Sequence, residues 1–240
     1  MVHYKKLFGD PLFWTALKNT IVFCFVTIPV TITLSIVLAN AIHLTKALKP
    51  LIRTSVFIPS IVSVTVIALI FIQFYAHDGY LSLLGQFLGF DEQQRGLLLN
   101  DQTALFSIML MDILVSTGYY AILFLASIQN ISTDLFENAE LAGANSLQKF
   151  WHITLPQLRP MILFALVINT IKSFQIFTEI FIMTKGGPLN ATTTMIYRIY
   201  ELGFRDFQMG YASAMAYVLL IIIGVFAWIQ IRLLKTKEAT

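Results

Sequence analysis

Five long apolar runs, separated by polar segments, dominate the chain. Residues 19–45, 54–77 and 207–231 contain no Lys, Arg, Asp or Glu, residues 102–133 contain only Asp112, and residues 160–184 contain only Lys172 and Glu179. Each run reaches the roughly 20 residues that a helix needs to cross about 30 Å of hydrocarbon. Because barrel strands alternate over about 10 residues, continuous runs of this length predict transmembrane helices.

We place spans near 19–41, 54–75, 104–128, 161–183 and 210–233, and expect an all-α, polytopic membrane helix bundle. Pro29 and Pro59 lie inside the first two spans, where each removes a backbone hydrogen bond and is expected to kink its helix. Composition agrees with a membrane protein, because only 12% of the residues are charged, against about 25% in soluble domains.

Three shorter segments have their own patterns. Residues 80–90 form an apolar run that is too short to span, and we expect it along the outer interface or against the bundle. Residues 186–194 are rich in Gly, Pro and Asn and predict a turn. Residues 195–209 predict a short external amphipathic helix.

The polar segment 134–160 is amphipathic and predicts two short helices joined by a bend. Asp134 is a candidate N-cap, and Glu137 completes the spacing of a capping box. Gly143 can adopt positive φ and end the first helix. Asn145 or Ser146 can cap the second.

The ends and the surface of this segment suggest what it contacts. Pro156 is expected to stop the second helix, and Pro160 leads into the next span. The segment has more apolar residues than a solvated loop needs, and few basic residues for binding headgroups. We therefore favour contact with a protein over a pair of helices resting on the membrane surface.

The positive-inside rule barely orients the chain. Residues 42–53, 129–160 and 234–240, with Arg232 at their edge, hold eight Lys and Arg, and residues 1–18, 76–103 and 184–209 hold seven. The short segment 42–53 carries three of the eight and no acid, which places 129–160 in the cytoplasm. We expect an extracytoplasmic segment over 1–18, a membrane domain over 19–234 and a cytoplasmic tail over 235–240.

The stretch ENAELAGANSLQKFWHITLPQLRP resembles the cytoplasmic EAA loop of permease subunits of binding-protein-dependent ABC importers. The family pattern is Glu-Ala-Ala, three residues, Gly, about nine residues, then Ile-x-Leu-Pro. The matching positions are Glu137, Ala139, Gly143, Ile153, Leu155 and Pro156, with Ala144 beside the glycine. Asn138 and Ala142 depart from the pattern, the latter where sugar-type members usually carry Asp, so polar contacts made through that Asp are absent here.

Three further stretches resemble the maltose and glycerol-phosphate type of these permeases. They are DPLFWTALKNT, GGPLNATTT and FQMGYASAMA. The GGP form is similar to the first of the two paired permeases. Family members have six or more spans, so we expect that a first helix is missing from this chain.

The resemblance implies a multi-pass subunit of the prokaryotic cytoplasmic membrane that forms half of a pore and performs no covalent chemistry. It implies a second permease as heterodimer partner, two ATPase subunits and an extracytoplasmic solute-binding protein, with no nucleic acid. It implies no cofactor in this chain, since ATP and Mg bind the ATPase. The residues matching the EAA pattern would then couple the ATPase to the pore. The absence of a Walker A sequence in the chain agrees with this division of labour.

Polar side chains inside the third and fourth spans are candidates for a solute path, since polar residues at such depth usually face a cavity or a partner. They supply hydroxyl partners and aromatic faces for a sugar: Asp112, Tyr119, Tyr120, Asn169, Lys172, Ser173, Gln175 and Glu179. The structural alternative is that Lys172 pairs with Asp112 or Glu179 and holds helices together.

Other functions remain open at this point. The same machinery could carry a phosphate ester, a polyamine or another polar solute, and Lys172 would suit an anion. An intramembrane enzyme would need clustered His, Asp or Cys, whereas the four histidines are scattered and Cys24 is alone. An ion channel would need a charged ring or a filter loop, and neither pattern occurs in the sequence.

Overall fold

The computed structural model describes residues 2–45, 49–80 and 96–234, and within these ranges it contains helices and no strand. The helices are α1 (Val2–Phe8), α2 (Pro11–Leu44), α3 (Lys49–Ile61), α4 (Val64–Tyr75), α6 (Ala104–Gln129), α7 (Thr133–Leu141), α8 (Ser146–Lys149), the π-helix η1 (Phe150–Thr154), α9 (Leu155–Gln157), α10 (Arg159–Phe174), α11 (Thr178–Met183), α12 (Met195–Tyr200), the π-helix η2 (Glu201–Arg205) and α13 (Met209–Leu234).

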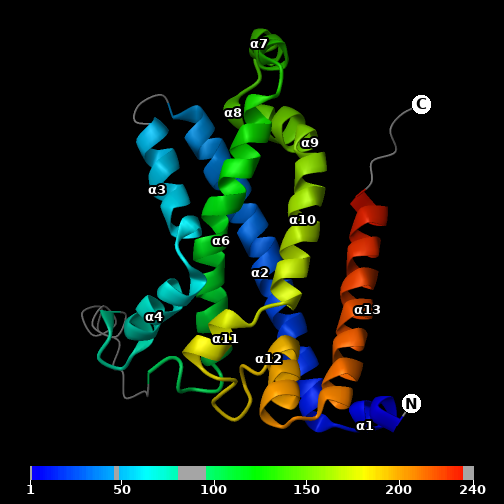
Figure 1. Cartoon of the computed structure of the whole chain (residues 1–240). Helices are drawn as coiled ribbons and strands as arrows, with labels where there is room; N and C mark the ends of the chain where they lie inside the picture. The colour runs from blue at the N-terminus through cyan, green and yellow to red at the C-terminus, as the bar shows by residue number, and fades with distance from the viewer. Residues whose placement is uncertain (1, 46–48, 81–95, 235–240) are drawn as a thin grey trace.

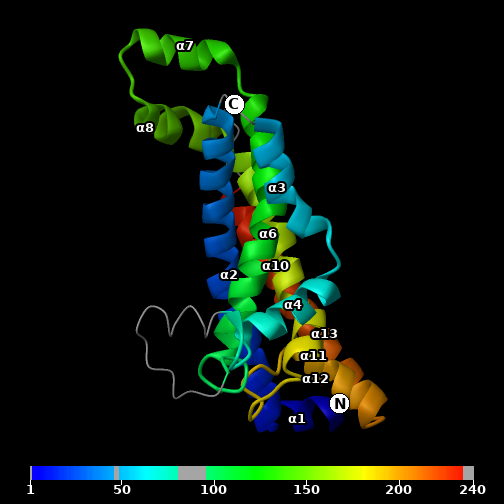
Figure 2. The ribbon, with the colours of Figure 1, turned by 90° about the vertical axis from the view of Figure 1, so that its left-hand side faces the viewer.

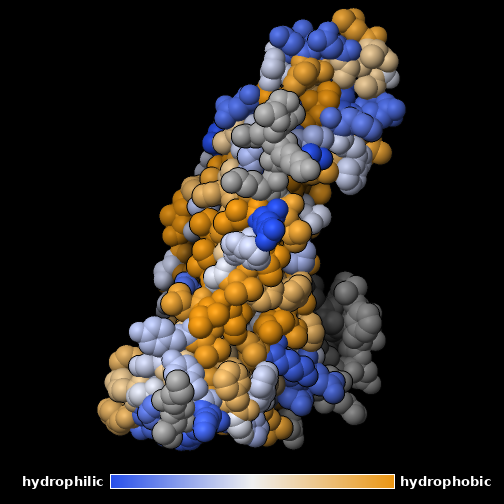
Figure 3. Space-filling model, turned by 90° about the vertical axis from the view of Figure 1, so that its right-hand side faces the viewer, coloured by the Kyte–Doolittle hydropathy of each residue, from blue (hydrophilic) through white to orange (hydrophobic). Residues whose placement is uncertain are grey.

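The long helices stand side by side as a bundle, with α7 and α8 at one end and α1 and α12 at the other (Figure 1). Within the described chain, four helical segments are long and apolar enough to cross a membrane, and the bent pair α3–α4 makes a fifth if it counts as one span. On the face that Figure 3 shows, apolar side chains predominate in the middle of the molecule and polar side chains gather toward its two ends. The predicted all-α membrane bundle is confirmed.

Helix α2 is longer than the first predicted span because a polar residue, Asp10, determines where it starts. Asp10 is its N-cap and accepts a hydrogen bond of 2.9 Å from the backbone N–H of Leu12, and Pro11 occupies the first turn. Proline is tolerated there because its missing N–H would have no partner inside the helix. Pro29 lies inside the helix, which continues without a break to Leu44.

The second predicted span, 54–75, is not one straight helix. Helices α3 and α4 meet at an angle of 95° across Val62 and Ser63, and the φ of −54° and ψ of 131° at Ser63 lie outside the helical region. The break follows Pro59, the residue at which the sequence predicts a kink, by three positions. As a result α4 leaves the direction of the bundle and lies across its lower part (Figure 1).

The fourth predicted span is also interrupted. Helix α10 ends at Phe174, the chain leaves helical conformation over residues 175–177, and α11 starts at Thr178. The backbone N–H of Gln175 closes the last turn of α10 with bonds of 3.2 and 3.1 Å to the carbonyls of Ile171 and Lys172. The break exposes Gln175 and directs the backbone of α11 toward α4.

The end of the bundle opposite α7 is an ordered cap. The segment 184–194 packs Thr192, Thr193 and Thr194 into the interior, and the Asn19 side chain donates to the carbonyls of Asn190 and Thr193 at 3.1 and 3.0 Å. The predicted turn over 186–194 is present, and helix follows it over 195–205. Residues 81–90 of the short apolar run lie outside the described residues.

Candidate functional site

Two helices and a connecting turn project from one end of the bundle and form the first candidate site. Figure 2 shows α7 extending away from the bundle axis and the chain returning through α8 toward α10. Residues 142–145 separate the two helices. The bend predicted for segment 134–160 therefore exists.

The turn after α7 depends on Gly143. Its φ is +80°, a value that residues with a Cβ rarely adopt. The N–H of Ala144 donates to the carbonyl of Ala139 and the N–H of Gly143 donates to the carbonyl of Glu140, both at 2.9 Å. This pair of bonds is a Schellman motif, which satisfies carbonyls at the end of a helix. The prediction that Gly143 ends the first helix through positive φ is confirmed.

The start of α7 differs from the prediction. Ser132 is the N-cap, Asp134 lies in the first turn, and no side chain makes a capping hydrogen bond. The prediction of a capping box between Asp134 and Glu137 is therefore wrong, because the helix starts earlier than the acidic residue suggested. Asp134 still lies where the helix dipole favours negative charge.

A capping box is present at the second helix instead. The N–H of Gln148 donates to Oδ1 of Asn145, and the N–H of Asn145 donates to Oε1 of Gln148, both at 2.8 Å. Reciprocal bonds of this kind fix the direction in which the chain enters a helix. Of the two caps that the sequence left open, Asn145 is the one used.

The chain after α8 widens into a π-turn rather than stopping at Pro156. The N–H of Leu155 reaches the carbonyl of Phe150, and Pro156 then lies in the first turn of α9. The expectation that Pro156 ends the second helix is wrong, since helical conformation continues to Gln157. Pro160 does start the next span, in the first turn of α10.

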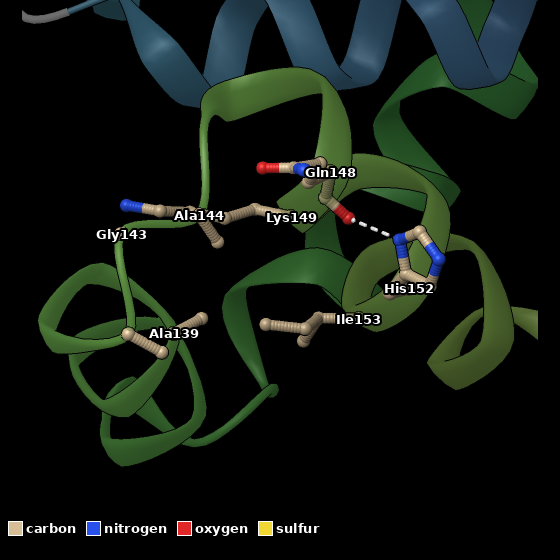
Figure 4. A pocket seen from close by; sticks show the side chains of 8 residues that line it. Ala139, Gly143, Ala144, Gln148, Lys149, His152 and Ile153 are labelled. Carbon is tan, nitrogen blue, oxygen red and sulfur yellow. Dashed lines mark hydrogen bonds between the residues drawn. The ribbon is translucent and has the colours of Figure 1, made fainter.

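A cleft of about 280 Å³ lies between α7 and the α8–η1 segment. Its lining residues are Ala139, Ala142, Gly143, Ala144, Gln148, Lys149, His152 and Ile153. Ala139 and Ile153 lie on facing walls, and Nδ1 of His152 lies 3.0 Å from the carbonyl oxygen of Gln148 (Figure 4). Four of the seven residues that the resemblance assigns to coupling thus meet at this cleft: Ala139, Gly143, Ala144 and Ile153. Glu137 does not line it, and Leu155 and Pro156 lie beyond it in α9.

An ion pair that sequence reasoning missed connects the two helices. Nζ of Lys149 lies 3.1 Å from Oε2 of Glu140, with Glu140 largely exposed. Their spacing of nine residues falls outside the rules for pairs within one helix, so only the fold brings them together.

The outer surface of this coupling loop, as we name residues 134–160, is apolar with an acidic side. Leu141 is 88% exposed, and Leu147 and Trp151 are also exposed. Glu137 is exposed and has no hydrogen-bond or ion-pair partner among the described residues. The sequence signal for Leu141 and Trp151 was the apolar excess of the segment, whereas Leu147 gave no separate signal.

The second candidate site lies inside the membrane domain, where α10 faces α6. Nζ of Lys172 lies 3.0 Å from Oδ1 of Asp112 and donates a 2.6 Å hydrogen bond to Oγ of Ser116. Ser116 in turn donates to Oδ1 of Asp112 at 3.1 Å. Of the two ion pairs that the sequence left open for Lys172, the one with Asp112 forms. Ser116 was missed, although it lies four residues after Asp112 on the same helix face.

A cavity of about 100 Å³ opens beside this ion pair at the break between α10 and α11. Its lining residues are Phe23, Asp112, Lys172, Ser173, Gln175, Ile176, Phe177, Thr178 and Glu179. It unites five of the eight predicted path residues. The aromatic ring of Phe177 was missed because the sequence gave no sign that the helix breaks there.

The three other predicted path residues do not line this cavity. Tyr120 is buried in the main hydrophobic core, and Tyr119 is partly exposed on α6. Asn169 is only 1% exposed, and neither of its side-chain polar atoms has a hydrogen-bond partner in the described structure. The described residues contain no group of His, Cys, Asp or Glu that could hold a metal ion.

Comparison with known proteins gives relatives along nearly the whole chain. The "Probable ABC transporter permease protein YurN" of Bacillus subtilis is 37% identical, with 98% of this chain and 82% of the relative covered. The "Lactose transport system permease protein LacF" of Rhizobium radiobacter is 33% identical over 94% of this chain and 77% of its own length.

Solved structures share the fold. A bacterial alginate ABC transporter, solved in complex with an alginate pentasaccharide-bound periplasmic protein, contains a chain that superposes with a TM-score of 0.89 at 23% identity. The match covers 99% of this chain and 84% of that one. At this identity the likeness establishes the architecture.

The family model of the binding-protein-dependent transport system inner membrane component matches residues 31–237. It includes the coupling loop and, apart from Phe23, the residues that line the cavity at the α10–α11 break. The chain therefore belongs to this family and is a multi-pass ABC transporter permease of the inner membrane, a transport subunit rather than an enzyme.

Proposed function

We propose that this permease forms half of the translocation path for a saccharide in an ATP-driven importer. The observation that carries the proposal is the cavity at the α10–α11 break. It combines the ring of Phe177 with polar groups from Ser173, Gln175 and Glu179 inside a membrane helix bundle. Sugars need hydroxyl partners and aromatic faces. LacF, a relative named for lactose transport, supports the same class of solute.

The coupling loop is proposed to dock a separate ATPase subunit, which binds ATP and Mg. The Schellman turn at Gly143 and the capping box at Asn145 hold its two helices in one conformation before any partner binds. A pre-organised surface loses less conformational entropy on association. The exposed side chain of Leu141 is a suitable apolar anchor for such a contact.

Glu137 is proposed to accept a charge-assisted hydrogen bond from a basic residue of the ATPase. What supports this role is that Glu137 is exposed and is not used as a helix cap. Glu137→Gln keeps the shape and removes the charge, so it should weaken association with the ATPase and lower uptake. Intact assembly together with intact transport would exclude the contact.

The assembled importer is proposed to contain a second permease, two ATPase subunits and an extracytoplasmic solute-binding protein. The family description supports the last of these. The coupling loop would face the cytoplasm, and residues 1–18 would lie on the outer side. In each transport cycle, closure of the ATPase dimer would move the coupling loops and switch the pore between inward- and outward-facing states.

Two experiments test this function. Co-purification from membranes should recover an ATPase and a second permease with the tagged chain. Proteoliposomes that contain the assembled complex and its binding protein should accumulate a labelled saccharide only with ATP inside. Gln175→Ala should raise the half-saturating saccharide concentration. ATP-dependent uptake of a phosphate ester or a polyamine in place of any saccharide would contradict the proposal.

A further inference from the structure

The cavity at the α10–α11 break contains an acidic side chain, Glu179, that forms no ion pair among the described residues. Glu179 lies on α11, is 7% exposed and lines the cavity together with Asp112 and Lys172. Four ion pairs form among the described residues, and none of them includes Glu179. A carboxylate at this depth usually pairs with a base or faces a polar solute.

The helices around Glu179 supply no unpaired cation among the described residues. Helix α11 packs against α4 and α6, and its Phe181 lies against Tyr200 of α12. The cation of α12, Arg198, pairs with Glu201 at 3.4 Å. The sequence of α4, VTVIALIFIQFY, contains no charged residue, and the charged residue of α6 is the acidic Asp112. Lys172 is therefore the base that lies beside both acids of the cavity, Asp112 and Glu179.

Lys172 is already committed to the first of these acids. Its ammonium is held by Oδ1 of Asp112 at 3.0 Å and by Oγ of Ser116 at 2.6 Å. A solute anion would have to compete with this carboxylate for Lys172, and it would also have to approach Glu179. The cavity thus presents two carboxylates against one ammonium.

We propose that this cavity selects uncharged saccharides and excludes acidic ones, with Glu179 as the residue that rejects a carboxylate or sulfonate on the sugar. This inference rests on the proposed function, because it names the class of saccharide. Like charges brought together in a desolvated site are strongly unfavourable, so rejection needs no steric clash. A sugar hydroxyl, in contrast, can donate a charge-assisted hydrogen bond to the same carboxylate.

The test measures binding of labelled trisaccharides to the purified complex in lipid nanodiscs, with no solute-binding protein present. Omitting that protein removes its own selectivity from the result. Matched pairs are galactotriose with trigalacturonate and cellotriose with triglucuronate. We expect at least one uncharged trisaccharide to bind about tenfold or more tightly than its acidic counterpart, since each like-charge contact is costly.

Variants assign the selectivity to named groups. Glu179→Gln removes the unpaired charge and should reduce the ratio of the two dissociation constants by about tenfold. Asp112→Asn releases the ammonium of Lys172 and should also favour the acidic sugar. Thr178→Ala, which lines the same cavity without a charge, should leave the ratio unchanged.

The outcomes separate this inference from the function on which it rests. Equal binding of both members of each pair, or a ratio unchanged in Glu179→Gln, would overturn the charge selectivity and leave saccharide transport standing. Binding of neither member of any pair, with the complex intact, would overturn both.

Discussion

Lys172 on α10 and Asp112 on α6 form an ion pair of 3.0 Å in which the two partners differ in exposure. The Lys172 side chain is 46% exposed, whereas that of Asp112 is 6% exposed. Removing the lysine strands a buried carboxylate, but removing the acid leaves an ammonium that can reach the polar cavity. We predict that Lys172→Met lowers the free energy of unfolding by about 2 kcal/mol and Asp112→Asn by less than about 1 kcal/mol.

The double variant should be more stable than the sum of the single changes predicts, because each group is costly mainly when its partner is missing. Thermal unfolding of the purified protein in one detergent measures all four members of this cycle. Strict additivity, or a larger loss for Asp112→Asn than for Lys172→Met, would contradict the assigned pairing.

Gly118 allows α6 to approach α3 closely. A Cβ built on Gly118 would overlap the carbonyl oxygen of Val56, whereas one on Gly224 of α13 meets nothing within 4 Å. Gly118→Ala should therefore separate the two helices and cost about 1–3 kcal/mol. Gly224→Ala is the matched control and should keep or raise stability, because alanine favours helix. Equal unfolding temperatures for the two variants would show that the α3–α6 contact is looser than described.

Substitutions at Gly143 test the effect of backbone strain without a steric clash. Nothing lies within 4 Å of a Cβ built on Gly143, so a substitution there is opposed by its φ of +80° alone. Gly143→Val should cost about 1–2 kcal/mol in the loop conformation and reduce ATPase association. Asparagine tolerates this region of φ, so Gly143→Asn should retain most association. Pull-down of the ATPase measures both, and an order reversed between Val and Asn would refute the turn.

Two interactions in the coupling loop should contribute unequally to the local stability of α8. The capping box of Asn145 holds two backbone bonds, and its loss in Asn145→Ala should cost about 0.5–2 kcal/mol of local helix stability. The Lys149–Glu140 pair has a largely exposed acid, so Lys149→Ala should cost less than about 1 kcal/mol. Hydrogen exchange of the amides of α8 reports the difference. Faster exchange in Lys149→Ala than in Asn145→Ala would contradict this order.

The features predicted correctly from sequence depend on local chemistry. Apolar length defines the spans, and the conformational freedom of Gly143 and the short amide side chain of Asn145 define the loop. The N-cap of α7 was misplaced because Ser132 and Asp134 are both capable caps, and α7 starts at Thr133. The 95° bend at Ser63 and the break after Phe174 lie within apolar runs, where hydrophobicity gives no signal for backbone direction.

The two candidate sites also differ in how far the sequence could predict them. The residues of the coupling loop follow one another in sequence, so a motif could identify them. The cavity takes Phe23 from α2, Asp112 from α6 and Glu179 from α11. Which acid pairs with Lys172 was open from sequence, because the choice depends on how helices far apart in the chain pack.

Site-specific cross-linking from Leu141 tests most directly the central claim that the coupling loop docks the ATPase. The only cysteine of the chain, Cys24, is buried, so an introduced cysteine carries a label cleanly. Leu189 is 87% exposed against 88% for Leu141. It belongs to the segment between α11 and α12, two helices at the end of the bundle opposite α7 (Figure 1), which makes it a matched control. In assembled complexes, a photo-cross-linker on Leu141→Cys should capture the ATPase subunit, and the same label on Leu189→Cys should not. Capture of the ATPase from position 189, or from neither position in an intact complex, would contradict the account.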